Sequence, residues 1–288
     1  MIKGRIIKGI GGLYFVAAND KVYECYARGK FRKMGLTPTV GDYVEIEETT
    51  DDGRATIEKI EQRKNILIRP KVANVDCAVI QFAAANPDIN FDLLDRFLIL
   101  AHTQKIDHII ICINKKDLLN DEVKELIDRV YAPLYDVVYT CALNGKDVEK
   151  LKEKLYGKVT VFAGPSGVGK SSVINSLMPQ TERKTGEISQ KIKRGKHTTR
   201  EVELLEYNKD TFIVDSPGFT SLSLDFIDAE DLKYYFKEFS PYLTGCYFNN
   251  CSHIAEPDCS LKARVGKEVS KERYDRFVGL YNELKQRR

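Results

Sequence analysis

Two nucleotide-binding motifs occur in this chain in an unusual order, and that order limits the folds that the chain can adopt. The first motif is a charged run, Asn114-Lys115-Lys116-Asp117. The second is a glycine-rich loop, Gly164-Pro165-Ser166-Gly167-Val168-Gly169-Lys170-Ser171. An ordinary domain that binds guanine nucleotides has the loop first. The reversed order predicts a nucleotide-binding domain whose chain has been cut and rejoined, so that both of its ends continue into other parts of the protein.

The glycine-rich loop matches the pattern G-x-x-x-x-G-K-[ST] and stands between a predicted strand and a predicted helix. Glycines let the backbone curl so that its N–H groups surround phosphates, and the N-terminus of the helix adds positive potential. We expect Lys170 to reach the β- and γ-phosphates and Ser171 to bind Mg²⁺, with Ser172 beside them in the phosphate site.

The charged run is predicted to select the base. The Asp117 carboxylate can accept hydrogen bonds from N1–H and the amino group of guanine, and adenine lacks both donors. The aliphatic part of Lys115 can cover the base, and Asn114 can tie this turn to the phosphate loop. Cys141 and Ala142 follow another predicted strand and resemble the segment whose backbone N–H contacts guanine O6.

Two further segments complete the predicted nucleotide site. Asp215-Ser216-Pro217-Gly218 matches D-x-x-G, so Asp215 would hold Mg²⁺ through a water molecule and the Gly218 N–H would contact the γ-phosphate. The basic stretch at residues 181–200 has few apolar side chains and is expected to be a mobile switch. Thr198 or Thr199 at its end can complete the Mg²⁺ shell.

The chain divides into three predicted parts: a β-barrel at residues 1–66, an α/β domain at 71–222 and a helical domain at 223–288. Five short strand-like runs in the first part favour an OB-type barrel, and an SH3-like barrel remains open. In the second part, strands alternate with helices, which predicts a mainly parallel, doubly wound sheet. In the third part we expect one helix at about residues 228–239 and a last helix at about 270–288 with an apolar stripe. The predicted strands of the barrel are 4–10, 13–18, 22–27, 43–47 and 55–60.

The third part also holds a predicted metal site. Cys246, Cys251, His253 and Cys259 offer three thiolates and one imidazole within fourteen residues. This is a complete tetrahedral set for a structural Zn²⁺ ion, with no position open for catalysis. The surrounding chain has little apolar material of its own, so metal binding would supply much of its folding energy. A disulfide or buried free thiols are the alternatives.

Composition excludes two classes of protein. The net charge of +3 is too small for a general nucleic-acid binder, and the longest apolar runs have the length of a strand rather than of a membrane-spanning helix. The N-terminus shows no signal peptide. We therefore expect a cytoplasmic protein, monomeric and without membrane contact.

The motif order, the sequence Gly-Lys-His-Thr-Thr at residues 195–199 and the cysteine pattern together resemble the RsgA family of circularly permuted GTPases. The resemblance covers essentially the whole chain. It implies an OB-fold, a GTPase domain and a zinc domain. It also implies slow hydrolysis of GTP to GDP, stimulated by the 30S ribosomal subunit, with release from that particle and its 16S rRNA after hydrolysis.

The resemblance also suggests a catalytic group. Phe219 follows the D-x-x-G motif, where Ras-like proteins have the glutamine that orients the attacking water. A phenylalanine cannot do this, so the family suggests His197 instead.

Two other functions compete with this one: a P-loop kinase or ATPase acting on a small substrate, and a non-catalytic zinc/OB protein that binds RNA. Basic side chains on the last helix could contact RNA phosphates, although such a face is more often simply solvated. They are Lys271, Arg273, Arg276, Lys285, Arg287 and Arg288.

Overall fold

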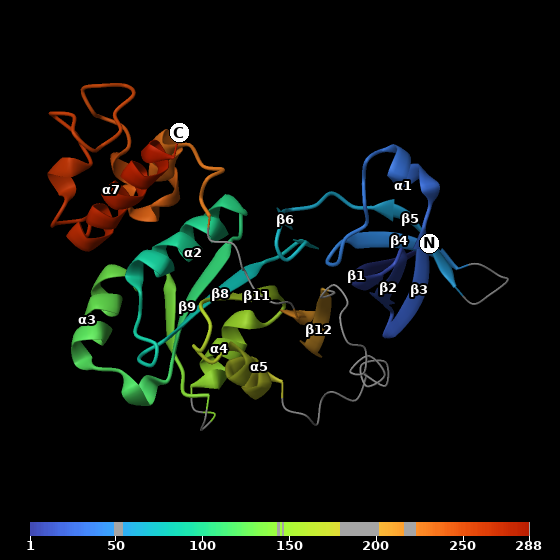
Figure 1. Ribbon diagram of the computed structural model, residues 1–288. Helices are drawn as coiled ribbons and strands as arrows, with labels where there is room; N and C mark the ends of the chain where they lie inside the picture. The colour runs from blue at the N-terminus through green and yellow to red at the C-terminus, as the bar shows by residue number, and fades with distance from the viewer. Residues whose placement is uncertain (49–53, 143–144, 146, 179–201, 216–222, 288) are drawn as a thin grey trace.

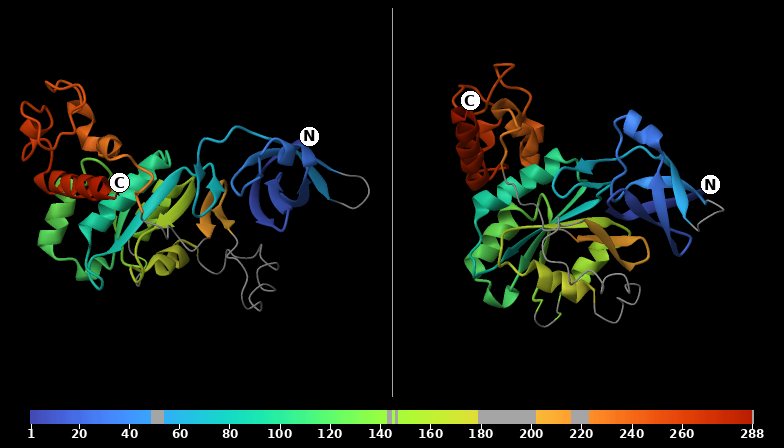
Figure 2. Two further views of the ribbon diagram at one scale, coloured as in Figure 1. Left: turned by 45° about the horizontal axis from the view of Figure 1, so that its top comes forward. Right: turned by 45° about the vertical axis from the view of Figure 1, so that its right-hand side comes forward.

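A computed structural model describes residues 1–48, 54–142, 145, 147–178, 202–215 and 223–287 (Figure 1). An N-terminal barrel and a C-terminal segment lie on opposite sides of a central sheet that is flanked by helices, and all views agree on this arrangement (Figure 2). No helix among the described residues is both long and apolar enough to span a membrane.

The N-terminal strands form a closed barrel. Strand β1 pairs with both β2 and β4, and β3 runs parallel to β5, so the closed order is β1-β2-β3-β5-β4-β1. This is the order of an OB-fold, and it excludes the SH3-like alternative. A short helix, α1 (Gly29–Lys33), lies between β3 and β4. The barrel strands are β1 (Ile2–Ile10), β2 (Leu13–Ala18), β3 (Lys21–Ala27), β4 (Tyr43–Glu48) and β5 (Ala55–Ile60).

The central sheet has the order β10-β9-β8-β11-β13-β12, and its first five strands are parallel. The predicted parallel sheet is therefore confirmed. Every residue of β8 is buried, as expected for a parallel strand covered on both faces. The antiparallel edge strand β12 is not among the predicted strands. The strands are β8 (Cys77–Ala83), β9 (His108–Asn114), β10 (Asp136–Tyr139), β11 (Val159–Ala163), β12 (Glu203–Asn208) and β13 (Thr211–Asp215).

Helices cover both faces of this sheet, which confirms the doubly wound prediction. Helices α2 (Phe91–Thr103) and α3 (Asp121–Val130) pack into one buried cluster, and α4 (Val148–Leu155) and α5 (Lys170–Leu177) pack into another. The side chains of Asn90 and Asn120 cap α2 and α3 by accepting hydrogen bonds from backbone N–H groups in the first turn.

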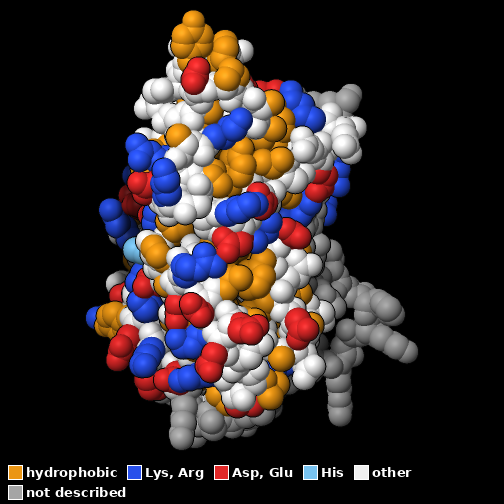
Figure 3. Space-filling model, turned by 90° about the vertical axis from the view of Figure 1, so that its left-hand side faces the viewer, with side chains coloured by type: hydrophobic (Ala, Val, Ile, Leu, Met, Phe, Trp, Pro, Cys, Tyr) orange, Lys and Arg blue, Asp and Glu red, His pale blue; other side chains and the backbone are white. Residues whose placement is uncertain are grey.

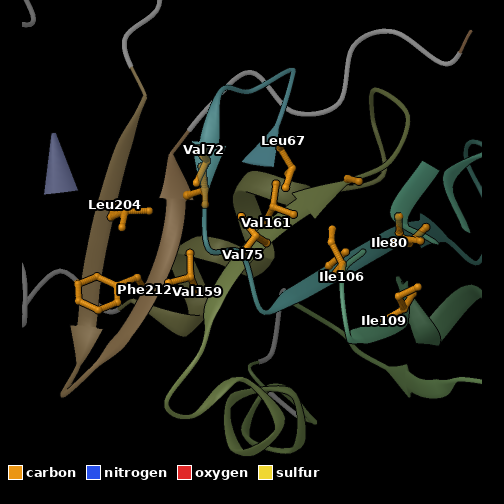
Figure 4. Close-up of a cluster of buried hydrophobic side chains, with 14 of the residues drawn as sticks. Leu67, Val72, Val75, Ile80, Ile106, Ile109, Val159, Val161, Leu204 and Phe212 are labelled. Carbon is orange, nitrogen blue, oxygen red and sulfur yellow. The ribbon is translucent and has the colours of Figure 1, made fainter. Parts of the chain in front are cut away.

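Two connections join the barrel to the sheet. The hairpin of β6 (Ile66–Leu67) and β7 (Val72–Ala73) adds Leu67 and Val72 to the cluster that also holds β11 and β13 side chains (Figure 4). In addition, Lys8 of β1 forms a β-bridge with Glu203 of β12. The Lys8 ammonium is almost fully buried and lies 2.9 Å from the Glu203 carboxylate. The barrel is thus bonded directly to the edge of the central sheet.

The C-terminal segment contains one α-helix, α7 (Lys271–Gln286), preceded by short 3-10 helices. The helix predicted near residues 228–239 is present as two 3-10 helices, η3 (Ala229–Tyr235) and η4 (Lys237–Tyr242), and not as one continuous helix. The break falls at Phe236, whose ring stacks on Phe239 and meets the edge of Phe277. The burial of these three rings therefore outweighs the continuation of one regular helix through Phe236. A third 3-10 helix, η5 (Lys262–Arg264), precedes α7.

Helix α2 belongs to two hydrophobic cores. Leu94, Phe97 and Leu98 face the sheet, whereas Ile99 and Leu100 pack into the core of the C-terminal segment. That second core includes Phe277 and Leu284 from the apolar stripe predicted on the last helix, so the stripe is confirmed as packing.

An ion-pair network crosses the same contact and removes Arg273 and Arg276 from the proposed basic face of α7, whereas Lys271, Lys285 and Arg287 are exposed and Arg288 lies outside the described residues. Arg273 is 1% exposed and pairs with Glu238 at 2.7 Å and with fully buried Asp95 of α2. Arg276 pairs with Asp95 at 2.6 Å. Because these guanidinium groups are buried or paired, they are not free for phosphates. Basic and acidic side chains are intermixed over the side of the molecule seen in Figure 3. The further ion pairs of α7 among the described residues are Lys271–Asp275, Lys285–Glu230, Arg287–Asp225, Arg287–Glu283, Arg129–Glu272 and Arg96–Glu283.

Candidate functional site

The predicted nucleotide motifs meet at one edge of the central sheet. β9 ends at Asn114, β11 ends directly before Gly164, and β10 ends shortly before Cys141. β13 ends at Asp215. Parallel strands present their carboxyl ends at a common edge, which is where open α/β sheets bind ligands. The structure therefore brings these segments together although their order along the chain is reversed.

Asn114 joins the segment that reads the base to the phosphate loop. It is 3% exposed, and its Nδ2 donates a hydrogen bond to the Val168 carbonyl at 3.0 Å. Its Oδ1 accepts from the Ala142 N–H at 3.2 Å and from the Thr140 hydroxyl at 3.3 Å. The Ser176 hydroxyl of α5 donates to the Ala142 carbonyl at 3.2 Å. The predicted link is thus present: Asn114 contacts the phosphate loop through Val168 and the chain after β10 through Ala142.

Asp117 stands in an exposed 3-10 turn, η1 (Lys116–Leu118). The Cys141 thiol donates to its Oδ1 at 3.2 Å, so Cys141 orients this carboxylate. Lys115 adopts the left-handed conformation, and its ammonium donates to the Asn86 carbonyl. Lys116 pairs with Asp147 at 2.7 Å, and that hydrogen bond lowers the pKa of the Asp147 carboxyl. The turn therefore exposes Asp117 to solvent, whereas the ammonium groups of both lysines are held by hydrogen bonds to neighbouring residues.

At each end of the phosphate loop, at Gly164 and at Gly169, there is no space for a side chain larger than that of glycine. A Cβ on Gly164 would lie 2.0 Å from the Gln81 carbonyl oxygen, and a Cβ on Gly169 would lie 2.4 Å from Nδ2 of Asn114. Both glycines, and Gly167 between them, have positive φ angles. Close approach to β8 and β9 thus holds the loop tightly on the sheet.

Lys170 folds back over this loop. Its Nζ donates to the carbonyls of Gly164 at 2.8 Å and Pro165 at 2.6 Å, and burial lowers the pKa of its ammonium. Ser171 and Ser172 are exposed in the first turn of α5, next to the helix N-terminus, which is a favourable site for a phosphate. This arrangement can hold a polyphosphate between lysine, backbone N–H groups and helix.

Gln81 is a site residue that the sequence-based reasoning missed. It lies in β8, is 0% exposed, and its Nε2 donates to the Val168 carbonyl at 3.2 Å. The signal was present in the sequence, because Gln81 is the one amide in an otherwise apolar strand, Cys-Ala-Val-Ile-Gln-Phe-Ala.

Several predicted residues fall outside the part of the chain that the structure describes. They are His197, Thr198, Thr199, Gly218 and the side chain of Asp215. The backbone of β13 pairs with β11, so the end of this strand lies next to the strand that feeds the phosphate loop.

The four predicted metal ligands form one cluster. The ligand atoms of Cys246, Cys251, His253 and Cys259 all lie within 4.8 Å of one another. Nδ1 of His253 is 3.3 Å from Sγ of Cys259 and 3.6 Å from Sγ of Cys246, and these two sulfurs are 4.0 Å apart. A tetrahedral zinc ion would separate such ligands by about 3.6–3.8 Å. The arrangement therefore fits zinc.

The surroundings of this cluster favour thiolates. Backbone N–H groups of Ser260 and Lys262 donate to the sulfurs of Cys246 and Cys259 at 3.3 and 3.4 Å. Without a cation, burial raises the pKa of the Cys251 thiol to about 12. A bound divalent ion reverses that preference, because it stabilises the deprotonated form. The four ligands can thus hold a metal ion, whose positive charge would neutralise the negative charge of the thiolates.

Comparison with known proteins gives the same picture. The family model described as RsgA GTPase matches residues 60–225, and the model described as RsgA N-terminal domain matches residues 3–57. Proteins from Alkaliphilus metalliredigens and Clostridium novyi, both named small ribosomal subunit biogenesis GTPase RsgA, are 46% and 47% identical to this chain. The first alignment covers 100% of this chain and 99% of the relative, and the second covers 98% and 97%.

Two solved structures resemble the whole fold. The crystal structure of YjeQ from Thermotoga maritima has a TM-score of 0.87 at 35% identity, covering 100% of this chain and 99% of that one. The crystal structure of YloQ, described as a circularly permuted GTPase, has a TM-score of 0.85 at 35% identity, covering 100% and 96%. Since the RsgA GTPase model matches more than half of the chain and the relatives align with it from end to end, this protein belongs to the RsgA family of circularly permuted GTPases.

Proposed function

We propose that this GTPase acts in the assembly of the small ribosomal subunit, and that binding to the 30S particle accelerates its slow hydrolysis of GTP. The observation that carries the proposal is the 46% identity, across the full chain, to a relative named for biogenesis of that subunit. In this proposal GTP and GDP set the affinity for 16S rRNA, so that hydrolysis releases the protein. A cytoplasmic, monomeric protein fits this role.

The proposal divides the chain into an OB-fold domain at residues 1–66, a permuted GTPase domain at 71–222 and a zinc-binding domain at 223–288. The closed barrel of β1–β5 and the separate C-terminal hydrophobic core support the division. The two outer domains would then contact RNA while the central domain binds the nucleotide.

Within the GTPase domain, the roles of the site residues follow from position. Asp117 would read guanine with Lys115 over the base, and Lys170 and the loop N–H groups would hold the phosphates. Mg²⁺ would be bound by Ser171, by Thr198 or Thr199, and by Asp215 through water. The remaining residues of the proposed nucleotide site are Asn114, Lys116, Cys141, Ala142, Gly164, Pro165, Ser166, Gly167, Val168, Gly169, Ser172 and Gly218.

A GTPase assay with and without 30S subunits tests this function. We expect 30S subunits to raise turnover at least tenfold and 50S subunits to leave it unchanged. His197→Ala should lose most of this stimulation while it keeps GTP affinity, because an imidazole that orients water acts on the chemical step and not on binding.

His108→Ala is the matched control for that variant. His108 is an exposed histidine at the start of β9, at the opposite end of the strand from the nucleotide motif. This variant should respond to 30S subunits as the wild type does. Turnover of the wild type that ignores 30S subunits would refute the proposed function, and full stimulation of His197→Ala would remove His197 from the mechanism.

We further propose one structural Zn²⁺ ion per chain, held by Cys246, Cys251, His253 and Cys259. When bound, zinc would crosslink the chain between Cys246 and Cys259, a stretch without an α-helix or a strand. All four ligand positions are filled by protein atoms, so the ion has no open position for substrate.

Cys251→Ser should remove this zinc, because a hydroxyl is a far weaker ligand than a thiolate. Metal analysis of the purified variant should give less than about 0.2 equivalents, against about one for the wild type. Cys112→Ala changes a buried thiol of β9 outside the cluster and should keep its zinc. Wild-type protein with no zinc would contradict the proposal.

A further inference from the structure

Two side-chain amides from neighbouring strands converge on one carbonyl of the phosphate loop. Gln81 of β8 and Asn114 of β9 both donate to the Val168 carbonyl oxygen, at 3.2 and 3.0 Å. A carbonyl oxygen has two lone pairs, so this acceptor is fully used. Both donors are buried, at 0% and 3% exposure, and Val168 itself is fully buried. The Val168 carbonyl is therefore directed inward, against the end of the sheet.

The direction of this carbonyl fixes the direction of the next N–H group. A trans peptide is planar, and its C=O and N–H bonds point in opposite directions. With the Val168 carbonyl held against the sheet, the Gly169 N–H points away from the sheet, toward the open side of the loop. Backbone N–H groups on that side are the ones that surround phosphates in such loops.

From this geometry we infer that Gln81 is a positioning residue for nucleotide binding, which aims the Gly169 N–H at a phosphate by holding the preceding carbonyl. The backbone of the same residue lies close to the other end of the loop, because a Cβ on Gly164 would lie 2.0 Å from the Gln81 carbonyl oxygen. Any residue at position 81 would present that carbonyl, so the inference concerns the side-chain amide alone.

A purely structural role does not explain this glutamine. Its Oε1 is buried and has no hydrogen-bond partner among the residues that the structure describes. A buried polar atom without a partner destabilises the folded state, and an apolar side chain of similar shape would avoid that cost. The hydrogen bond from its Nε2 to the loop carbonyl is what accounts for an amide at this position.

Gln81 and Asn114 also differ in what they control. Asn114 contacts Thr140 and Ala142 in addition to Val168, so it connects base recognition with phosphate binding. Among the residues that the structure describes, the Gln81 side chain hydrogen-bonds to the phosphate loop alone. Loss of the Gln81 amide should weaken phosphate binding and leave the choice of base unchanged.

The test is Gln81→Met, which keeps the length of the side chain and removes its donor. We expect GDP affinity to fall by about two- to tenfold, the range for one neutral hydrogen bond. The KM for GTP should rise by the same factor with unchanged kcat, because the contact is equal in the ground and transition states. The preference for GTP over ATP and the melting temperature should not fall.

Thr160→Val is the matched control. Thr160 is another buried polar residue of the same sheet whose hydroxyl oxygen has no hydrogen-bond partner in the described part of the chain. It lies near the start of β11, at the far end of the strand from the phosphate loop. Its replacement should leave GDP affinity, KM and kcat at wild-type values.

The inference would be overturned if Gln81→Met bound GDP as tightly as the wild type, or if its preference between GTP and ATP changed. A melting temperature lowered by more than about 3 °C would also overturn it, because it would show that the glutamine supports the fold. The inference rests on nucleotide binding and not on the ribosomal role. A wild-type protein that binds GDP but ignores 30S subunits would therefore refute the proposed function and leave Gln81 as assigned.

Discussion

Gly164→Ala is expected to destabilise the GTPase domain by roughly 3–5 kcal/mol. The new Cβ would lie 2.0 Å from the carbonyl oxygen of Gln81, which is backbone of a central, fully buried strand and cannot move away. Gly164 also has a φ angle of +143°, a conformation that other residues rarely adopt. Chemical denaturation should show the loss, and whatever folded protein remains should bind GDP poorly because the loop is displaced.

Gly157→Ala separates the collision from the backbone strain. Gly157 has a φ angle of +69°, but a Cβ there would meet nothing within 4 Å. A left-handed alanine in open space costs about 1 kcal/mol. Equal stability losses in the two variants would show that the loop does not depend on its contact with β8.

Asp117→Asn is expected to lower GTP affinity by about 100- to 1000-fold and to raise XTP affinity. The carboxylate would accept hydrogen bonds from two guanine donors, whereas an amide in its place would offer one donor where guanine also has a donor. Xanthine has a carbonyl at that position, so the amide can pair with it. Competition of GTP, XTP and ATP for a fluorescent nucleotide measures the change directly.

Asp20→Asn provides the control for this substitution. Asp20 is an exposed aspartate in the turn between β2 and β3 of the barrel, far along the chain from the nucleotide motifs. It should leave the preference for GTP intact. If Asp117→Asn still preferred GTP over XTP, Asp117 would not be the residue that reads the base, and a P-loop protein with another specificity would again have to be considered.

The sequence predicted the local elements and the motif residues because both depend on short patterns. In the strand expected at 43–47, apolar Val44 and Ile46 alternate with Tyr43, Glu45 and Glu47, and the structure buries Val44 and Ile46 and leaves Tyr43 exposed. The phosphate loop and the run from Asn114 to Asp117 each carry their chemistry in consecutive residues. Their meeting at one edge of the sheet could also be expected, since each motif follows a parallel strand.

Features that depend on contacts between distant segments could not be predicted in this way. Arg273 reads as one more basic residue of an exposed helix, and its burial depends on two acidic side chains, Asp95 and Glu238, that arrive from other elements. In the same way, the role of Gln81 depends on a carbonyl that lies 87 positions further along the chain. The break at Phe236 depends on the packing of three aromatic rings, which no local periodicity reveals.

The bridge from Lys8 to Glu203 connects the barrel physically to the edge of the sheet that carries the nucleotide motifs. Strand β12 is hydrogen-bonded to β1 on one side and to β13 on the other, and β13 ends at Asp215. A macromolecule that rotates the barrel must therefore either move this strand pair or break a partly buried ion pair. Such energetic linkage is reciprocal. If GTP changes the affinity of the barrel for a bound macromolecule by some factor, that macromolecule must change the affinity for GTP by the same factor.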